Sequence, residues 1–588
     1  MKEAPEQPVG NLAPAQWGSD VIAAMLRRLD VRHVALNPGS SFRGLHDSLV
    51  NHLGNRDPQM LLCLHEEHAV SIAHGWARVT GTPMAVILHA NVGLMHAAMA
   101  LYNAWCDRVP MLVFGATGPV DAAARRPWID WLHTSRDQAA LVRPYVKWDD
   151  QPASLAASLQ AMVRADAITR TAPHAPVYVC FDVTVQEAPL EAGAPALPDP
   201  VRHAPPCPAD PPQDAVADLA ARLAAAHAPV LLMGRCSRDE ADWMRRIALA
   251  ERTGARVVTD IKTAAAFPTD HPLHAGAPGY FLSEGGAEAL RAADLVVAFD
   301  WVDPAGTLAQ AAAAPEFVAL VGLDHLLHNG WSLDHQALSP SDLHIAAAPD
   351  RAVAALVEVL GAEGPGSCEA PPVGPSAEAP VPTGEMDVRG LAAALRAGLG
   401  GEHVSLLRVP LGWDGASWPF RHPLDYLGFD GGAGIGSGPG MAVGMAMALH
   451  GSGRLPVAVL GDGDYMMGVS ALWTAARYGV PLLIVVANNR SFFNDEIHQE
   501  RVARERARPV ENRWIGQRIG GPDIDIAAIA RAQGLDAYGP VEDASELAEL
   551  LPDAAAAVRE GAAVVIDARI AGGYSAAMTR GMTDTAQG

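Results

Sequence analysis

The sequence predicts an α/β protein of three doubly wound domains, each built on a parallel sheet with helices on both faces. The chain has 588 residues, which at roughly 100–200 residues per domain corresponds to about three domains. Two proline- and alanine-rich stretches without periodicity, residues 189–211 and 363–384, are typical of linkers. Between them, short apolar runs alternate with helical patterns, which indicates parallel strands buried on both faces.

The linkers divide the chain into an N-terminal domain of residues 1–188, a middle domain of residues 212–362 and a C-terminal domain of residues 385–588. Each domain contains several apolar runs bounded by turn residues, and helical stretches such as Glu66–Val79 lie between them. The predicted strands are HVALNPG, PMAVILHA, PMLVFGA and APVYVCFDV in the first domain, PVLLMG, ARVVTDI, DLVVAFD and FVALVG in the second, and LPVAVLGDG, PLLIVVANN and AAVVIDARI in the third.

Charge and composition exclude several classes of protein. The 43 Lys and Arg residues against 66 Asp and Glu give a net charge of −23, so nucleic acid is not an expected partner. The basic run Arg501–Arg508 is best explained as a solvated helix face. Charged residues make up only 19% of the chain, which indicates much internal surface in cores or between subunits.

The cysteines and the apolar segments indicate a soluble, cytoplasmic protein. None of the six cysteines has zinc-type spacing or belongs to an evident disulfide framework. The first residues lack the apolar segment of a signal peptide, and no uncharged apolar run of about 18 residues follows. We therefore expect reduced cysteines and no membrane partner.

Two polar strand ends in the last domain predict a metal site. Asp462 follows one apolar strand and Asn489 follows the next, 27 positions later. In an open α/β sheet, ligands lie beyond the carboxyl ends of the strands. A carboxylate and an amide oxygen suit Mg²⁺, which then takes further ligands from a phosphate. A Gly-Asp-Gly sequence alone would indicate only a capped turn, but its pairing with Asn488-Asn489 favours the metal site.

This pair resembles the GDG…NN signature of enzymes that use thiamine diphosphate. The resemblance implies that Mg²⁺ is bound by Asp462, Asn489 and the backbone carbonyl of Ser491. Gly461 and Gly463, which flank the aspartate, would let the backbone approach the diphosphate closely.

The glycine-rich segment from Gly431 to Gly444 precedes this signature and on composition alone would be a flexible loop. In the family, a bulky apolar residue of such a loop holds the cofactor in its V shape. Ile435 is the best match, and the backbone around Ala433 and Gly434 would then bond the aminopyrimidine ring.

The first domain supplies a candidate for the acid that activates the cofactor. A carboxylic acid bonded to N1′ of the pyrimidine stabilises the imino form that removes the proton from C2. His-Glu-Glu alone would indicate a solvated helix start. Its surroundings, including Gly75-Trp76-Ala77, resemble the pyrimidine-binding domain of this family, which assigns the role to Glu66 and makes Glu67 the alternative.

The resemblance covers nearly the whole chain, in the order pyrimidine-binding, middle and diphosphate-binding domain. The family is the acetolactate synthase, benzoylformate decarboxylase and pyruvate decarboxylase superfamily, and the sequence is most similar to its benzoylformate decarboxylase branch. The similar segments are NPGS (37–40), LHE (64–66), YNAW (102–105) and VSALWTAARYGVP (469–481). By position, Ser40 would bind the substrate carboxylate and His89 would shuttle protons, although His89 could also be a structural residue at a strand end.

Several positions depart from that branch. The second active-site histidine of its middle domain has no counterpart, since the nearest stretch carries Asp300 and Trp301. Asp495, Glu496 and His498 are acid–base candidates after the second strand end, with a solvated helix start as the alternative. The segment WIDWLHT (128–134) matches no pattern of the family. FAD is not expected, because the middle domain has no GxGxxG.

The resemblance implies a carbon–carbon lyase that decarboxylates a 2-keto acid through an enamine at C2 of the cofactor, with possible carboligase activity. The alternatives are an acetolactate synthase-like transferase, a lyase for 2-hydroxyacyl-CoA or 2-hydroxyketones, and a non-catalytic relative that keeps the fold. The expected partners are a small carbonyl substrate and a second copy of the chain, as a dimer or a homotetrameric dimer of dimers with the site between chains.

Overall fold

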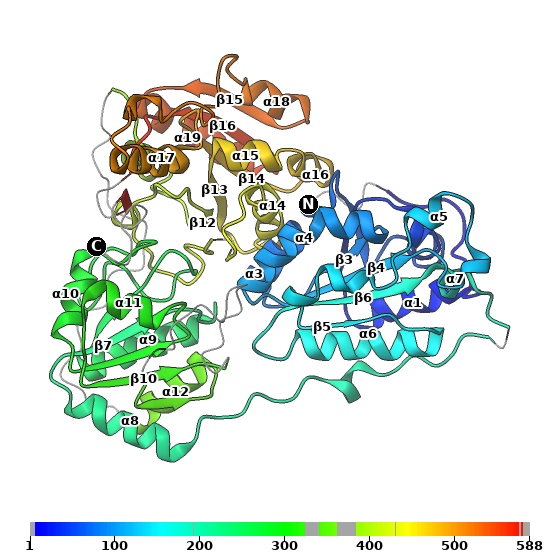
Figure 1. Cartoon of the computed structure of the whole chain (residues 1–588), viewed down its shortest axis with the longest axis horizontal. Helices are drawn as coiled ribbons and strands as arrows, with labels where there is room; N and C mark the ends of the chain where they lie inside the picture. The colour runs from blue at the N-terminus through cyan, green and yellow to red at the C-terminus, as the bar shows by residue number, and fades with distance from the viewer. Residues whose placement is uncertain are drawn as a thin grey trace.

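Three parallel sheets, one per predicted domain, form the protein (Figure 1). The computed structural model describes residues 6–191, 193–323, 339, 341–361, 384–429, 431–574 and 578–579. The predicted second linker, residues 363–384, lies outside the described residues except for Gly384. The first linker is described apart from residue 192, and Figure 1 shows it as an extended connection between the first two domains.

The N-terminal sheet has the strand order β2-β1-β3-β4-β6-β5, and every neighbouring pair is parallel. Its strands are β1 (His33–Leu36), β2 (Gln59–Leu62), β3 (Ala85–Leu88), β4 (Met111–Thr117), β5 (Trp148–Asp150) and β6 (Pro176–Asp182). Its α-helices are α1 (Gly18–Arg28), α2 (Arg43–Asp47), α3 (Glu66–Thr80), α4 (Ala90–Cys106), α5 (Ile129–Leu132), α6 (Leu155–Thr169) and α7 (Val183–Glu187).

The middle sheet has the order β11-β10-β9-β7-β8, again with parallel neighbours. Its strands are β7 (Pro229–Met233), β8 (Arg256–Val258), β9 (Leu295–Phe299), β10 (Phe317–Val321) and β11 (Leu343–Ile345). Its helices are α8 (Gln213–Ala225), α9 (Glu240–Thr253), α10 (Glu284–Ala292), α11 (Pro304–Ala311) and α12 (Pro349–Leu360).

The C-terminal sheet has the order β12-β13-β14-β16-β15 and is also parallel throughout. Its strands are β12 (Val404–Arg408), β13 (Leu455–Gly461), β14 (Leu482–Asn488), β15 (Asp536–Val541) and β16 (Ala563–Arg569). Its helices are α13 (Val388–Gly398), α14 (Gly438–Ala448), α15 (Asp462–Gly468), α16 (Ala471–Tyr478), α17 (Phe493–Glu505), α18 (Ile526–Ala532) and α19 (Ala544–Arg559).

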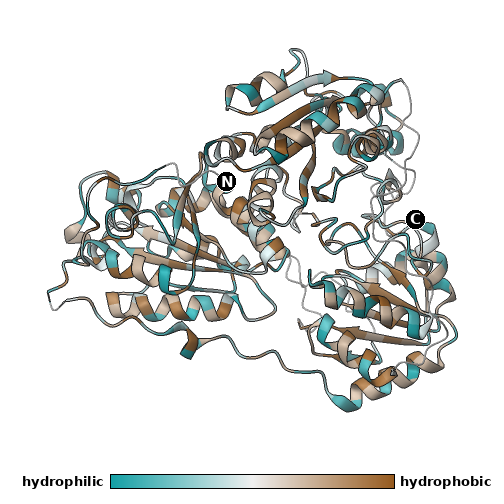
Figure 2. Cartoon of the chain, turned by 180° about the vertical axis from the view of Figure 1, so that it is seen from behind, coloured by the Kyte–Doolittle hydropathy of each residue, from teal (hydrophilic) through white to brown (hydrophobic). Residues whose placement is uncertain are grey.

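The predicted fold class is confirmed, and each of the eleven predicted apolar runs contains a strand. The helix expected over Glu66–Val79 is also present, as α3. Among the described residues, the sheets contain five further strands, β2, β5, β11, β12 and β15, and all five lie at sheet edges. Figure 2 shows brown, apolar strands inside each domain and mixed colours on the surrounding helices, as expected for buried parallel sheets.

The first and last domains pack directly on each other through α3 and α14. A Cβ atom on Gly75 of α3 would overlap the carbonyl oxygen of Met441, and one on Gly444 of α14 would overlap that of Ile72. The two helix backbones therefore approach more closely than any larger residue would allow. One apolar core joins residues of both domains, so α3 is held rigidly against the C-terminal domain.

Within the part of the chain that the structure describes, no helix combines the length and the apolar character needed to cross a membrane.

Candidate active site

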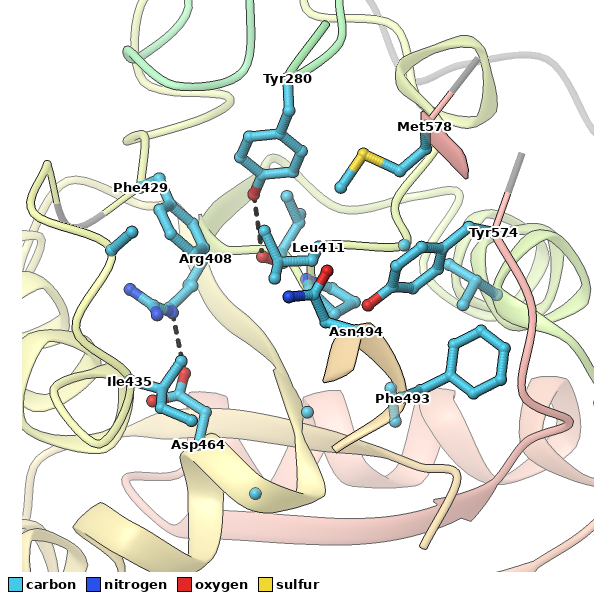
Figure 3. Close-up of a pocket in the computed structure, with 18 of the residues that line it drawn as sticks. Tyr280, Arg408, Leu411, Phe429, Ile435, Asp464, Phe493, Asn494, Tyr574 and Met578 are labelled. Atoms are coloured by element: carbon cyan, nitrogen blue, oxygen red, sulfur yellow. Dashed lines mark hydrogen bonds and ion pairs between the residues drawn. The ribbon is translucent and has the colours of Figure 1, made fainter. Parts of the chain in front are cut away.

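A cavity of about 610 Å³ opens at the carboxyl ends of β13 and β14 (Figure 3). Residues from the C-terminal domain form most of its wall, and Tyr280, Lys262 and Arg235 of the middle domain contribute to it. The position is the one at which open α/β sheets bind ligands, because the strand ends leave backbone and polar groups exposed there.

Hard oxygen ligands meet at one end of this cavity. Asp462, Asn489 and Ser491 all line it, as the sequence led us to expect. The backbone N–H of Ser491 donates to Asp462 Oδ2 at 3.2 Å and to Asn489 Oδ1 at 3.0 Å, which ties the two side chains together. Burial raises the pKa of Asp462 to about 6, although several backbone N–H groups oppose the shift. Because burial makes this carboxylate costly to ionise, a bound cation would stabilise its charged form.

The backbone beside these oxygens leaves room for a ligand. Gly461 and Gly463 line the cavity, and a Cβ atom on Gly461 would meet no atom within 4 Å. A Cβ on Gly463 would collide with the ring of Phe492. Close packing therefore excludes a larger residue at Gly463, whereas the backbone of Gly461 faces open space in the cavity.

The glycine-rich loop is fixed between two domains. Ala433 and Ile435 line the cavity, whereas Gly434 does not. Instead, the N–H of Gly434 donates to Asn103 Oδ1 at 3.3 Å, and Asn103 Nδ2 donates back to the Gly434 carbonyl at 3.2 Å. Asp464 accepts from the N–H of Gly436 at 2.6 Å. These bonds fix the position at which Ile435 enters the cavity.

The opposite end of the cavity is apolar and aromatic. Leu411, Phe493, Tyr574 and Met578 line it together with Tyr280, and Figure 3 shows their side chains grouped above the strand ends. The rings of Phe493 and Tyr574 meet edge to face at 5.3 Å. Burial raises the pKa of Tyr574, with Asp495 as the second cause, so its hydroxyl stays neutral.

The three cationic residues of the cavity wall are each paired with an aspartate. The pairs are Arg235 with Asp300 at 3.6 Å, Lys262 with Asp260 at 3.1 Å and Arg408 with Asp464 at 2.9 Å. Asp300 is also bonded by Arg108 at 2.7 Å, so Arg235 shares its partner with a second arginine, whereas Lys262 and Arg408 each have an aspartate within 3.1 Å.

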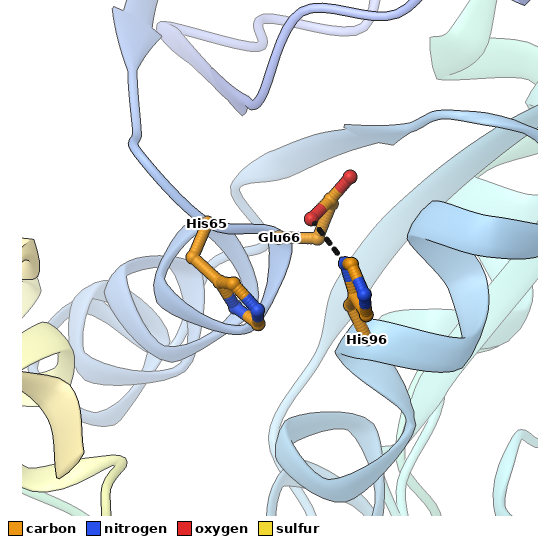
Figure 4. Close-up of side chains that lie close together, drawn as sticks. All are labelled: His65, Glu66 and His96. Atoms are coloured by element: carbon orange, nitrogen blue, oxygen red, sulfur yellow. Dashed lines mark hydrogen bonds and ion pairs between the residues drawn. The ribbon is translucent and has the colours of Figure 1, made fainter.

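Glu66 lies outside this cavity. It begins α3, is 6% exposed, and its Oε2 lies 3.0 Å from His96 Nδ1 (Figure 4). Glu67 is only partly buried. Its pKa is raised by burial and by Asp464 and lowered by His96. The predicted activating acid and the predicted metal ligands of one chain are therefore not brought together in the same cavity.

His89 lies between β3 and α4 and contacts Ser41, the neighbour of the predicted Ser40. Ser41 Oγ lies 2.9 Å from His89 Nδ1 and accepts from the N–H of Ala90 at 3.1 Å. Because the backbone N–H of Ser41 also donates to Nδ1, at 3.5 Å, Nδ1 is the acceptor and the Ser41 hydroxyl donates to it. Ser40 is exposed. A Cβ atom on Gly39 would overlap the His89 ring, which explains the glycine of the NPGS segment.

A second histidine, which the sequence analysis did not identify, lies beside His89. The rings of His89 and His133 meet edge to face at 4.8 Å. Burial lowers the pKa of His89, His133 lowers it further and Glu66 opposes the shift. His133 belongs to the segment 128–134, which matches no pattern of the family. The one histidine in that segment was the only sequence feature that could have marked it as a site residue.

The three acid–base candidates after β14 differ in exposure and in whether they line the cavity. Asp495 is exposed and lines the cavity. Glu496 is buried away from the cavity wall, with Ser491 Oγ donating to its Oε1 at 2.5 Å and Arg513 at 3.4 Å from its Oε2. His498 is half-buried and does not line the cavity.

Comparison with known proteins gives the family. Three family models match in order, described as the N-terminal TPP binding domain, the central domain and the C-terminal TPP binding domain of thiamine pyrophosphate enzymes. They match residues 16–141, 216–320 and 412–568. The chain belongs to the thiamine pyrophosphate enzyme family. The resemblance inferred from the sequence is thereby confirmed.

Relatives within this family differ in activity. Benzoylformate decarboxylase of Pseudomonas aeruginosa is 25% identical over 541 residues, or 87% of this chain and 92% of the relative. The acetolactate synthase large subunit of Lactococcus lactis is 25% identical over 283 residues, or 48% and 47% of the two chains. The solved 4-hydroxybenzoylformate decarboxylase of Rhodococcus jostii superposes with a TM-score of 0.75 at 22% identity, covering 95% of this chain and 99% of its own.

Proposed function

We propose that this member of the family is a thiamine diphosphate- and Mg²⁺-dependent carbon–carbon lyase that decarboxylates a 2-keto acid with an apolar side chain. The single observation that carries the proposal is the cavity described above. It combines the oxygens of Asp462 and Asn489 at one end with the aromatic wall around Tyr574 at the other.

The residues at the strand ends fit a magnesium diphosphate. Asp462, Asn489 and the Ser491 carbonyl would hold Mg²⁺, and Gly461 leaves the space that a diphosphate needs. Ile435 would support the bend between the two rings of the cofactor. When bound, thiamine diphosphate supplies a carbanion nucleophile and an electron sink. The protein must then supply binding, orientation and proton transfer.

The acid for the pyrimidine would come from a second copy of the chain. Glu66 does not line the cavity that carries Asp462, although both residues are needed at one cofactor. Large side chains near Glu66, including Leu64, Met95 and Met99, are exposed in the single chain. A dimer that covers them would complete two sites and remove apolar surface from water.

The cavity wall favours a small apolar substrate over a coenzyme A thioester. A thioester of that kind brings phosphate groups that require free cations, whereas Lys262 and Arg408 are already paired and Arg235 shares Asp300 with Arg108. An aryl or branched alkyl group would fit against Phe493 and Tyr574. Apolar surroundings also destabilise the substrate carboxylate relative to neutral carbon dioxide, which favours its loss.

His89 and His133 would manage the protons of the substrate. Burial keeps His89 neutral near pH 7, and a proton directed from Ser41 to Nδ1 leaves Nε2–H as a donor. Ser40 would contact the substrate carboxylate at the same edge of the N-terminal domain. Asp495, which lines the cavity of the other chain, is the preferred acid from α17 over Glu496 and His498.

A substrate panel tests the proposal directly. Holoenzyme would be incubated with benzoylformate, branched-chain 2-keto acids, pyruvate and a 2-hydroxyacyl-CoA, and carbon dioxide and aldehyde would be measured. The expected result is aldehyde formation from an aryl or branched 2-keto acid. Acetolactate from pyruvate would instead identify a transferase, and cleavage of the thioester alone would reject the argument from paired cations.

A further inference from the structure

A second cavity, of about 310 Å³, is lined by residues of the first domain, by residues 6–8 and by Tyr478 of α16. Its volume is at the lower end of the range for small-molecule sites, roughly 300–1,000 Å³. Among the described residues, it shares no lining residue with the cavity of the candidate active site. Binding in this second cavity therefore does not depend on the proposed function.

Apolar side chains form one wall of the second cavity. Leu36 and Leu62 are the last residues of β1 and β2, and Pro38, Val50 and Met60 also line the cavity. The carboxyl ends of parallel strands are a common place for ligands. An apolar tail placed against this wall would lose its contact with water, which favours binding.

The hydroxyl of Tyr478 is the polar group opposite that wall. It accepts from the backbone N–H of Leu62 at 2.9 Å and donates to Glu6 Oε2 at 3.4 Å. Burial raises the pKa of Tyr478, so the hydroxyl keeps its proton at neutral pH. Since the bond from Leu62 fixes the oxygen, the proton is available to a carboxylate in the cavity.

A carboxylate already occupies this position, since that of Glu6 is bonded by both Arg477 and Tyr478. The guanidinium of Arg477 also lies 5.3 Å from the ring centre of Trp473, which restricts its orientation. The chain therefore holds one of its own carboxylates, by two donors, at the edge of an apolar cavity.

We propose that the second cavity binds a small carboxylate with an apolar tail. The carboxylate of the ligand takes the place of Glu6 between Arg477 and Tyr478, and the tail lies against Leu36 and Met60. Because one carboxylate replaces another, both bonds are kept. The burial of the tail then supplies the net free energy of binding.

Other classes of ligand fit the charges of this cavity less well. Glu6 is the only acidic residue among the described residues that line it, and one carboxylate is too few for a metal ion. A phosphate would require several cations, whereas no lysine or arginine of the described residues lines the cavity itself. A neutral apolar ligand could use the wall but would leave Arg477 and Tyr478 bonded to Glu6.

The first test compares two probes with the same tail, hexanoate and hexan-1-ol, by calorimetric titration of the holoenzyme. Hexanoate should bind one site per chain, and hexan-1-ol should bind at least roughly 10-fold more weakly because it lacks the charge-assisted bonds. Equal affinity for the two probes would overturn the assignment of a carboxylate site. Absence of hexanoate binding would overturn the site itself.

The second test uses two variants with opposite expected effects on hexanoate affinity. Arg477→Gln removes the cation, so the Kd should rise roughly 10-fold or more. Glu6→Gln keeps the size of the side chain but removes the competing charge, so the Kd should fall roughly 2–5-fold, as for a partly exposed ion pair. Arg531→Gln is the matched control. It removes an exposed arginine bonded to the Ala537 carbonyl and should keep the wild-type Kd.

The signs of these effects decide the outcome. An unchanged Kd in Arg477→Gln would mean that hexanoate binds elsewhere, the candidate active site included, and would overturn the proposal. Weaker binding in Glu6→Gln would show that Glu6 completes the wall rather than competes for it, with the same consequence. A failed substrate panel would reject the proposed function, whereas the calorimetric titrations of these variants would still decide the carboxylate site.

Discussion

The two parts of the candidate site differ in how complete they are within one chain. At the ends of β13 and β14, the predicted metal ligands, glycines and an aromatic wall line one cavity. At the start of α3, Glu66 is buried beside His96, near His65 and His89, and does not line that cavity. One part therefore forms a cavity within the single chain, whereas the predicted activating acid lies outside it.

This difference indicates a division of labour. On the proposed function, we expect the C-terminal domain to provide affinity, since Asp462 and Asn489 could hold the charged end of a cofactor without help. We expect the N-terminal domain to provide proton transfer once a second surface brings a cofactor to it. Changes in the first part should therefore alter binding, and changes in the second should alter rates while binding persists.

The largest expected effect follows from Asp462→Ala. The change removes a buried carboxylate ligand, so the cofactor with Mg²⁺ should no longer stabilise the protein and turnover should be undetectable. Ligand at about 100 times its Kd stabilises a protein by about 2.7 kcal/mol, so the lost shift in melting temperature is easily measured. An unchanged shift in the variant would contradict the metal assignment.

Glu66→Gln should separate rate from binding. The amide keeps the shape of the side chain but cannot exchange a proton, so C2 exchange and turnover should fall roughly 10²–10⁴-fold. The thermal shift on adding cofactor and Mg²⁺ should stay near the wild-type value. Glu67→Gln is the matched control, and loss of exchange in that variant instead would show that the activating acid is Glu67.

Mixing the two inactive variants tests whether one site uses two chains. A hybrid dimer of Asp462→Ala and Glu66→Gln has one site with both residues intact and one site with neither. Random pairing on co-expression should therefore restore about one quarter of wild-type activity in a twofold-symmetric dimer. Recovery to no more than the activity of the single variants would indicate that both residues act within one chain.

The smallest expected effect concerns His133. Burial and then His133 lower the pKa of His89, and a lowered pKa means that His89 stays neutral to a more acidic pH. In His133→Asn the second cause is lost, so the acidic limb of kcat/KM should move to higher pH, by less than about one unit. His174→Asn, which removes a ring bonded to the Arg170 carbonyl, should leave the limb in place.

The sequence predicted the central strands well and the edge strands poorly. Central strands are buried on both faces and read as continuous apolar runs, as in β14. Edge strands have one neighbouring strand, and two of them are poorly buried: β5 consists of Trp148, Asp149 and Asp150, all half-buried, and β15 is largely exposed. Such segments carry no periodic signal, and only the neighbouring strand makes them part of the sheet.

The location of the candidate residues could be predicted where it follows from the order of strands, but not where it depends on side-chain direction. Asp462 and Asn489 follow apolar strands, so their location at one edge could be deduced. The contact of His89 with Ser41 rather than Ser40 depends on the short turn after β1. His96 and His133 reach the site from an interior helix position and from an unmatched segment, and no spacing in the sequence reveals either.

The close contact of α3 with α14 has a consequence for synthesis of the protein. Gly75 and its partner Gly444 are separated by about 370 residues, which a ribosome adds in roughly 20–70 s. For that time the face of α3 that packs on α14 has no partner, although the rest of its domain has emerged. The first domain therefore has its own core but keeps the α3 face uncovered until α14 has been synthesised.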